Sequence, residues 1–134
     1  VEVLWYDNKA RPDDPAGQAL KSEQGFLAFI DFIYKPMLKP YAAAARLQYF
    51  ETDDYNSRIY AYENDVLYSY SIPAFFEKGF RYYLNLNYDL GKKLSFWLRW
   101  AQTIYREKNT IGSGLDEIAG SRRSEMKVQV RWLF

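Results

Sequence analysis

The C-terminal residues 125–134 alternate strictly between two classes of side chain, and this alternation constrains the fold more than any other feature. One parity carries only apolar side chains, and the other is mostly charged or amide: Met126, Val128, Val130, Trp132 and Phe134 are the apolar set. Successive side chains of a β-strand point to opposite faces, so a period of two predicts a strand with one apolar face. Its length of about ten residues suits a tilted strand that spans a membrane.

The same period recurs upstream and predicts an all-β chain. Residues 80–88 and 94–104 alternate on either side of a short turn at 89–93, as the two arms of a hairpin do. We expect Leu84, Leu86, Leu98, Val128 and Val130 on one face, and Asn85, Arg99, Gln129 and Arg131 on the other. The pattern predicts six spanning strands, near 1–7, 23–35, 41–51, 78–88, 94–106 and 124–134.

The connections alternate in length, which is the layout of outer-membrane barrels. Short turns are expected at one rim, and long polar loops near 8–22, 52–79 and 107–123 at the other, extracellular rim. Residues 58–72 resemble two further strands around an Asn64-Asp65 turn. If they stay outside the membrane, six strands span it and other strands, from the same polypeptide or another chain, must complete the barrel. If they enter it, the chain closes an eight-stranded barrel.

The predicted fold class is therefore an antiparallel transmembrane β-barrel, over residues 1–134, as the C-terminal part of a larger barrel or as a small eight-stranded one. A soluble, lipocalin-like barrel that binds an apolar ligand is the alternative, because alternation does not tell inside from outside. Aromatic residues at strand ends, such as Tyr34, Tyr88 and Trp132, favour the membrane, where such residues form interfacial girdles. The expected location is the bacterial outer membrane.

The composition of the chain excludes several kinds of catalytic and metal site. The chain has no Cys and no His, so no thiol nucleophile, Ser-His-Asp triad or Cys/His zinc site can be assembled. The formal net charge of +1 is unlike the basic excess of nucleic-acid-binding domains. We expect a structural, scaffold or transport role without catalysis, no cofactor, no metal and no bound nucleic acid.

Two loops contain residues with some resemblance to ligand sites. Asp53, Asp54 and Asn56 offer oxygen ligands for calcium, but their spacing is not that of an EF-hand, and turn formation is the favoured interpretation. The sequence Ile111-Gly112-Ser113-Gly114 lacks the lysine of a phosphate-binding loop and is interpreted as a plain loop.

Charged residues on the polar parity of neighbouring strands are expected to line the lumen: Arg81, Arg99, Glu125, Lys127 and Arg131. The basic members could attract anions or pair with lipopolysaccharide phosphates near the rim. The favoured alternative is ion pairing with Glu125 and Asp31 that stabilises a wet interior.

The chain also resembles known proteins. Its end, with Val128, Val130, Trp132 and Phe134, is similar to the C-terminal signal of bacterial outer-membrane proteins that the barrel assembly machinery recognises. Residues 53–68 (DDYNSRIYAYENDVLY), 98–103 and 111–118 resemble Bacteroidota outer-membrane proteins of the helix-hairpin-helix domain-containing family. The resemblance implies the last strands of a large barrel, in contact with outer-membrane lipid and lipopolysaccharide. The helix-hairpin-helix segment itself is not in this sequence, so no DNA-binding residue carries over.

Overall fold

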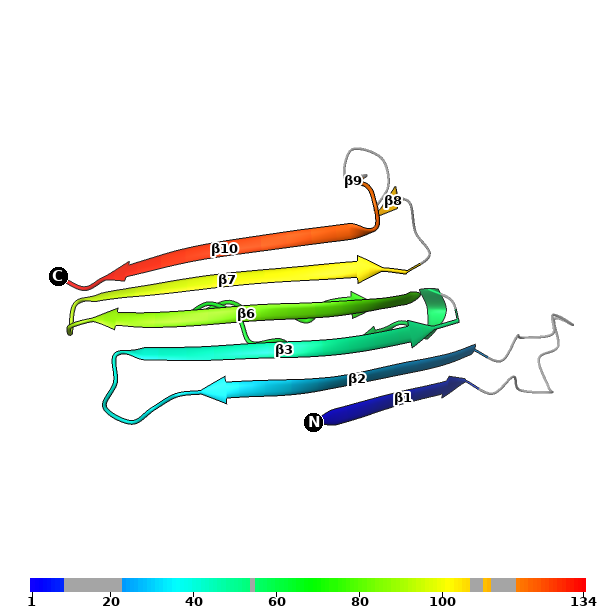
Figure 1. Ribbon diagram of the computed structural model, residues 1–134, viewed down its shortest axis with the longest axis horizontal. Helices are drawn as coiled ribbons and strands as arrows, with labels where there is room; N and C mark the ends of the chain where they lie inside the picture. Colours follow the sequence, from blue (N-terminus) through cyan, green and yellow to red (C-terminus); the bar gives the residue numbers. More distant parts are fainter. Residues whose placement is uncertain (9–22, 54, 107–109, 112–117) are drawn as a thin grey trace, which may run out of the picture.

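The computed structural model describes residues 1–8, 23–53, 55–106, 110–111 and 118–134, which form an all-β structure (Figure 1). Within these residues, six strands make one antiparallel sheet in the order β1-β2-β3-β6-β7-β10. The strands of this sheet are β1 (Glu2–Asn8), β2 (Glu23–Tyr34), β3 (Tyr41–Thr52), β6 (Lys78–Leu90), β7 (Leu94–Tyr105) and β10 (Arg122–Trp132). The predicted all-β, antiparallel architecture is confirmed.

The short elements lie in the connections between these strands. The β3–β6 connection contains the 3₁₀ turn η1 (Tyr55–Ser57) and the paired two-residue strands β4 (Ile59–Tyr60) and β5 (Ala74–Phe75). The β7–β10 connection contains the pair β8 (Thr110–Ile111) and β9 (Ile118–Ala119). Within the described chain, none of the helices has the length and hydropathy to cross a bilayer.

The register of the sheet sets the side chains of neighbouring strands in transverse rows that share one face. One transverse row runs from Asp31 through Arg46, Tyr83 and Ala101 to Glu125. The neighbouring residues along each strand point to the opposite face, so the period of two in the sequence becomes two chemically different faces. With 11 to 13 residues in each of β2, β3, β6, β7 and β10, these strands exceed the five or six residues common in globular sheets.

The two ends of the sheet differ in their connections. The β2–β3 and β6–β7 turns and the C-terminal Phe134 lie at one end (Figure 1). The long β3–β6 and β7–β10 connections both leave from the other end. The long connection near 8–22 falls on residues 9–22, outside the described part of the chain, as do residues 107–109 and 112–117 of the third long loop.

The connection between β3 and β6 folds back across one face of the sheet, and we call residues 55–76 the strap (Figure 1). The expected pairing of 58–63 with 66–72 is wrong in detail. The strap is closed by the β4–β5 pair and by a single bridge between Glu63 and Ser71. Strap residues contact β3 through the Tyr62 carbonyl and β6, β7 and β10 through side chains, and the strap has no regular two-stranded ladder.

The core lies between the strap and the sheet, around Leu27, Phe50 and Phe75. Close approach of the strap requires a glycine on β2. A Cβ atom on Gly25 would lie 2.8 Å from the carbonyl oxygen of Ser57. The absence of a side chain there lets η1 rest directly on the strand.

The sheet is open. Among the described residues, β1 pairs with β2 alone and β10 with β7 alone, so the first and last strands do not pair with each other. The strap also contributes no strand to the sheet. The eight-stranded alternative, in which this chain closes on itself, is therefore wrong for the described structure.

Candidate functional site

The face of the sheet under the strap, which we call the strap face, contains buried charge. Arg81 is 3% exposed and Arg99 1%, and they come from the adjacent strands β6 and β7. Glu63 of the strap is completely buried against them. Buried charges are stable only when they are paired and hydrogen-bonded, so these contacts decide whether the strap can stay in place.

Glu63 binds both guanidinium groups. Its Oε1 accepts a hydrogen bond from Arg81 Nε at 2.6 Å, and its Oε2 accepts one from Arg81 Nη2 at 2.9 Å and a short one from Arg99 Nη2. Arg81 also donates to Thr103 Oγ1 at 2.7 Å. The carboxylate thus bridges two cations on neighbouring strands, with bidentate geometry on Arg81, which is among the stronger arrangements of ionic hydrogen bonds.

Asp65 makes a second attachment between the strap and the sheet. Lys127 Nζ on β10 donates to its Oδ2 at 2.5 Å, and Arg99 Nε lies 3.8 Å from its Oδ1. Burial by itself raises the pKa of the Asp65 carboxyl, but hydrogen bonds from Lys127, the Val66 amide and Ser69, with the charge of Arg99, bring it below the ordinary value of 3.8. Asp65 is therefore ionised at neutral pH and pairs with cations of two strands.

Arg46 of β3 makes a third attachment. Its Nε and Nη2 donate to the two carboxylate oxygens of Asp31 at 2.6 and 2.7 Å, and its Nη1 donates to the Tyr62 carbonyl oxygen at 2.6 Å. The guanidinium carbon also lies 3.5 Å from the centre of the Phe29 ring, which is cation–π geometry. One side chain therefore joins β2, β3 and the strap.

The charged residues expected to line a lumen all lie on the strap face. Arg81 reaches Glu125 at 3.4 Å, in addition to Glu63. Arg131, further along β10, donates to Ser95 at 3.1 Å. Ion pairing includes the expected partners Asp31 and Glu125, but Glu63 and Asp65 of the strap supply the buried carboxylates, and the sequence pattern does not place these two on this face.

A small polar cavity lies beside the strap tip, on the same face. Its volume is about 280 Å³, and Asn64 and Asp65 of the strap form part of its wall. The sheet contributes the side chains of Asn85, Asn87 and Trp97.

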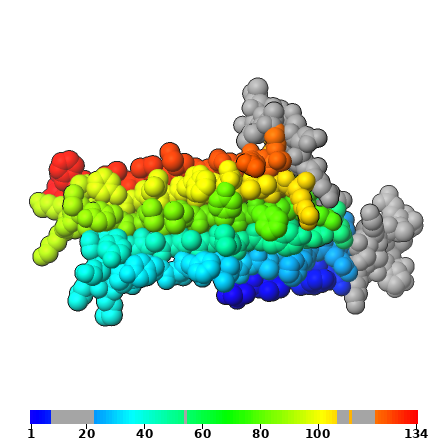
Figure 2. Space-filling model, in the orientation of Figure 1, coloured from blue at the N-terminus to red at the C-terminus, as the bar shows by residue number. Residues whose placement is uncertain are grey.

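The opposite face of the sheet, which we call the apolar face, is exposed. Figure 2 shows this side, on which no described segment covers the strands. Val128 is 64% and Val130 55% exposed, and Leu84, Leu86 and Leu98 lie on the same face. The expected division of these residues from Arg99 and its polar neighbours is therefore seen in the structure.

Aromatic rings lie at both ends of the apolar face, in a row at one end and in two separate pairs at the other. Near the long connections, four rings from β1, β2, β3 and β6 follow one another with centroids 5.0–6.4 Å apart: Trp5, Phe26, Tyr49 and Phe80. Near the short turns, Tyr34 contacts Tyr41, and Trp132 stacks on Phe134. Of the four assembly-signal residues, Val128, Val130 and Trp132 belong to β10, and all four are exposed.

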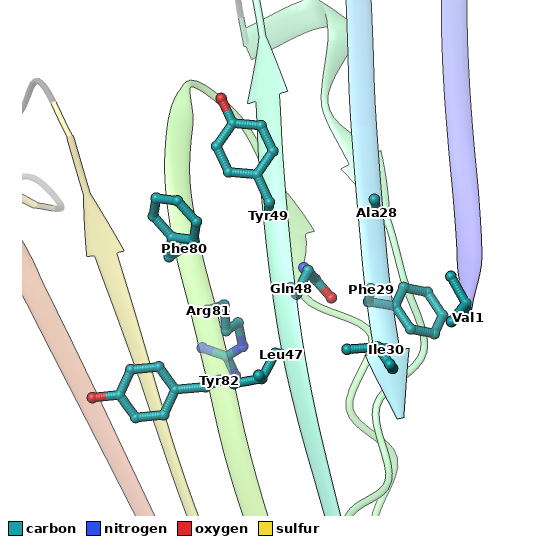
Figure 3. A pocket seen from close by; sticks show the side chains of 10 residues that line it. All are labelled: Val1, Ala28, Phe29, Ile30, Leu47, Gln48, Tyr49, Phe80, Arg81 and Tyr82. Atoms are coloured by element: carbon teal, nitrogen blue, oxygen red, sulfur yellow. The ribbon is translucent and has the colours of Figure 1, made fainter. Parts of the chain in front are cut away.

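A shallow hollow of about 470 Å³ lies on the apolar face next to this aromatic row (Figure 3). Ala28 and Leu47 form its floor, with the aromatic rings of Tyr49, Phe80 and Tyr82 beside them.

Of the two loop candidates, Asp53 and Asn56 have described contacts with β2. Asp53 Oδ2 accepts a hydrogen bond from the Gln24 amide at 3.0 Å, and Asn56 donates to Glu23 at 3.4 Å, as residues that shape a loop do. Asp54 and the glycines 112 and 114 lie outside the described residues. Groups of three or more potential metal-ligating side chains are absent from the residues that the structure describes.

Comparison with known proteins gives no relative: no family model, curated protein or solved structure matches this chain.

Proposed function

We propose that this chain forms the C-terminal strands of a bacterial outer-membrane β-barrel with a structural, scaffold or transport role and without catalysis. In this arrangement the apolar face contacts lipid and the strap face borders the lumen. The strap then narrows the lumen from within. Further strands, from the same polypeptide or another chain, complete the barrel at the edges of β1 and β10.

The contrast between the two faces of the sheet carries this proposal. Long strands expose a mostly apolar surface of aliphatic and aromatic side chains on one side, whereas charged side chains are buried under the strap on the other. A soluble sheet of this size buries its apolar face and exposes its charges, and a membrane barrel does the reverse. The aromatic rings at both ends of the apolar face add support, because aromatic girdles mark the two membrane interfaces.

The expected partners follow from this position. The exposed apolar face fits outer-membrane lipid and the acyl chains of lipopolysaccharide, and the end of β10 fits the barrel assembly machinery. The resemblance to Bacteroidota outer-membrane proteins of the helix-hairpin-helix domain-containing family agrees with a parent barrel larger than this sheet. We propose no nucleic-acid contact for this segment.

Cysteine labelling tests the orientation directly, because the chain has no native cysteine. A bimane probe on Val128→Cys should be quenched by nitroxide attached to lipid acyl chains. The matched variant Gln129→Cys, one residue further along β10, should respond to a water-soluble quencher instead. Equal responses of both positions to the water-soluble quencher would contradict the proposal.

A charge on the lipid side supplies a second test. Val128→Arg should lower the free energy of unfolding by about 2–4 kcal/mol if the residue lies near the bilayer midplane. Gln129→Arg should cost much less, because its side chain faces the polar interior. Denaturant titration of both variants in lipid vesicles measures the difference, and equal losses would argue against a lipid-facing Val128.

The second candidate function is a soluble barrel that carries an apolar ligand, and the hollow on the apolar face favours it (Figure 3). In that case, this face would have to be enclosed by other parts of the protein. Cell fractionation separates the two candidates. A membrane barrel remains with the envelope until detergent is added, whereas a carrier is found in buffer.

A further inference from the structure

The polar cavity beside the strap tip exists because two small side chains line its floor. Ala42 and Ala44 occupy strap-face positions of β3, where larger residues would fill the space. Across the β3–β6 pairing they lie opposite Asn87 and Asn85. The result is a pit about 280 Å³ in volume with amides on one wall, close to the lower limit of pockets that enclose small ligands.

Unused hydrogen-bonding capacity is concentrated next to Trp97, which lines the same cavity. Five buried side-chain polar atoms in the described chain have no partner, and three of them are Asn85 Oδ1, Gln129 Oε1 and Arg131 Nε. Gln129 pairs directly with Trp97 in the β7–β10 register, and the other two lie on neighbouring strands one pair away along this face. Of these three residues, Asn85 belongs to the cavity lining. Buried polar groups are normally satisfied, so its free Oδ1 marks a place for a hydrogen-bond donor in the cavity.

The lining combines an indole with amides and has balanced charge. Trp97 is held by Arg131, whose guanidinium carbon lies 5.4 Å from the ring centre. Lys35 and Asp65 contribute one cation and one anion to the lining. An aromatic surface suits the C–H groups of a ring, amides exchange hydrogen bonds with hydroxyls, and balanced charge favours a neutral ligand.

We propose that this cavity binds a neutral pyranose sugar, which stacks on Trp97 and exchanges hydrogen bonds with the side chains of Asn85 and Asn87. The inference deepens the proposed function, because it names what the polar interior takes up. It rests on that function only in treating the strap face as the water-filled side.

Fluorescence of Trp97 measures binding. In the variant Trp5→Phe, Trp100→Phe and Trp132→Phe, the emission comes from Trp97 alone, since the chain has four tryptophans. Titration with D-glucose or N-acetyl-D-glucosamine should give a saturable change, with a dissociation constant on the order of 1 mM or below. Glycerol, which has hydroxyls but no ring, should give none.

Matched variants locate the site. Ala44→Leu fills the cavity and should abolish the change, whereas Ala45→Leu, whose side chain lies on the apolar face of the same strand, should leave it intact. Asn87→Leu should weaken binding at least tenfold, which is about 1.4 kcal/mol. Thermal unfolding of each variant shows that it is folded. If Ala44→Leu does not fold, the Asn87→Leu result decides.

A folded protein that shows no saturable change with either sugar would overturn the proposal, and the cavity would hold water only. Unchanged binding in both Ala44→Leu and Asn87→Leu would also overturn it. The titration is run on the fraction that contains folded protein, envelope or buffer. A negative titration therefore does not affect the test of membrane location, and a negative location test does not affect the titration.

Discussion

Glu63→Gln should release the strap from the sheet while the sheet remains folded. The substitution keeps the size of the side chain and removes its negative charge. Arg81 and Arg99, which both donate to this carboxylate, are then left as buried cations with a weaker acceptor. Because the three side chains are 0–3% exposed, water does not screen the loss.

The size of the effect follows from the contacts that remain. Breaking a buried ion pair costs about 3–5 kcal/mol. In the variant, Arg81 still has Glu125 at 3.4 Å and Arg99 still has Asp65 at 3.8 Å as acidic neighbours. These contacts are longer than the 2.6 Å contact from Arg81 to Glu63, so they compensate part of the loss. We therefore expect the lower end, about 3 kcal/mol, which corresponds to roughly a hundredfold increase in the open population of the strap.

Hydrogen exchange of strap amides measures this opening. The Glu63 amide, which donates to the Ser71 carbonyl at 2.9 Å, should exchange about a hundredfold faster in the variant. Glu51→Gln is the matched control, because its pair with Lys78 is 2.9 Å long but about 40% exposed on both sides and is worth at most about 1 kcal/mol. If Glu63→Gln accelerates strap exchange no more than Glu51→Gln does, the buried network does not hold the strap.

Three further predictions concern the strap and the surface under it. The pKa of Asp65 lies below 3.8 in the folded state, so the ionised carboxylate stabilises the closed strap fully above pH 3.8, and this stabilisation is lost as the pH falls through the folded-state pKa. Proteolysis of the strap should therefore accelerate only in acid, and Asp65→Asn should make its rate depend less on pH. Gln48 is 3% exposed with both amide atoms unpaired, so Gln48→Met should raise the free energy of unfolding by about 1–3 kcal/mol in denaturant titration, and a loss would indicate a hidden partner. Gly25→Ala should lower the free energy of unfolding by about 1–3 kcal/mol, because the new Cβ meets the Ser57 carbonyl oxygen. An unchanged midpoint of the denaturant titration would show that η1 can move away from β2.

The strands of the sheet could be predicted from sequence because their signal is local. The period of two places β6 and β10 within two residues of their observed ends. It also divides Leu84 and Val128 from Arg99 correctly. Alternation works for β6 and β10 because each of these strands has one apolar and one largely polar face, so the class of each side chain indicates the face on which it lies.

The strap could not be predicted in the same way. Its position depends on Glu63 meeting Arg81 and Arg99, which lie 18 and 36 residues further along the chain. Local pattern carries no information about such pairs, and the two aromatic-rich stretches around Asn64-Asp65 resemble a hairpin. The available signal is weak: Glu63 and Asp65 share one parity, and two acids at successive positions of that parity suggest a basic surface opposite.

The position of the strap also bears on the two interpretations of the charged strip, the strap-face residues Arg81, Arg99, Glu125, Lys127 and Arg131. The network under the strap joins four cations, Arg46, Arg81, Arg99 and Lys127, to four carboxylates. Asp31 and Glu125 come from the sheet itself, whereas Glu63 and Asp65 come from the strap. With the strap in place these charges balance, and the strip is a structural ion-pair network. With the strap displaced, four cations face two acids, and the same surface attracts anions.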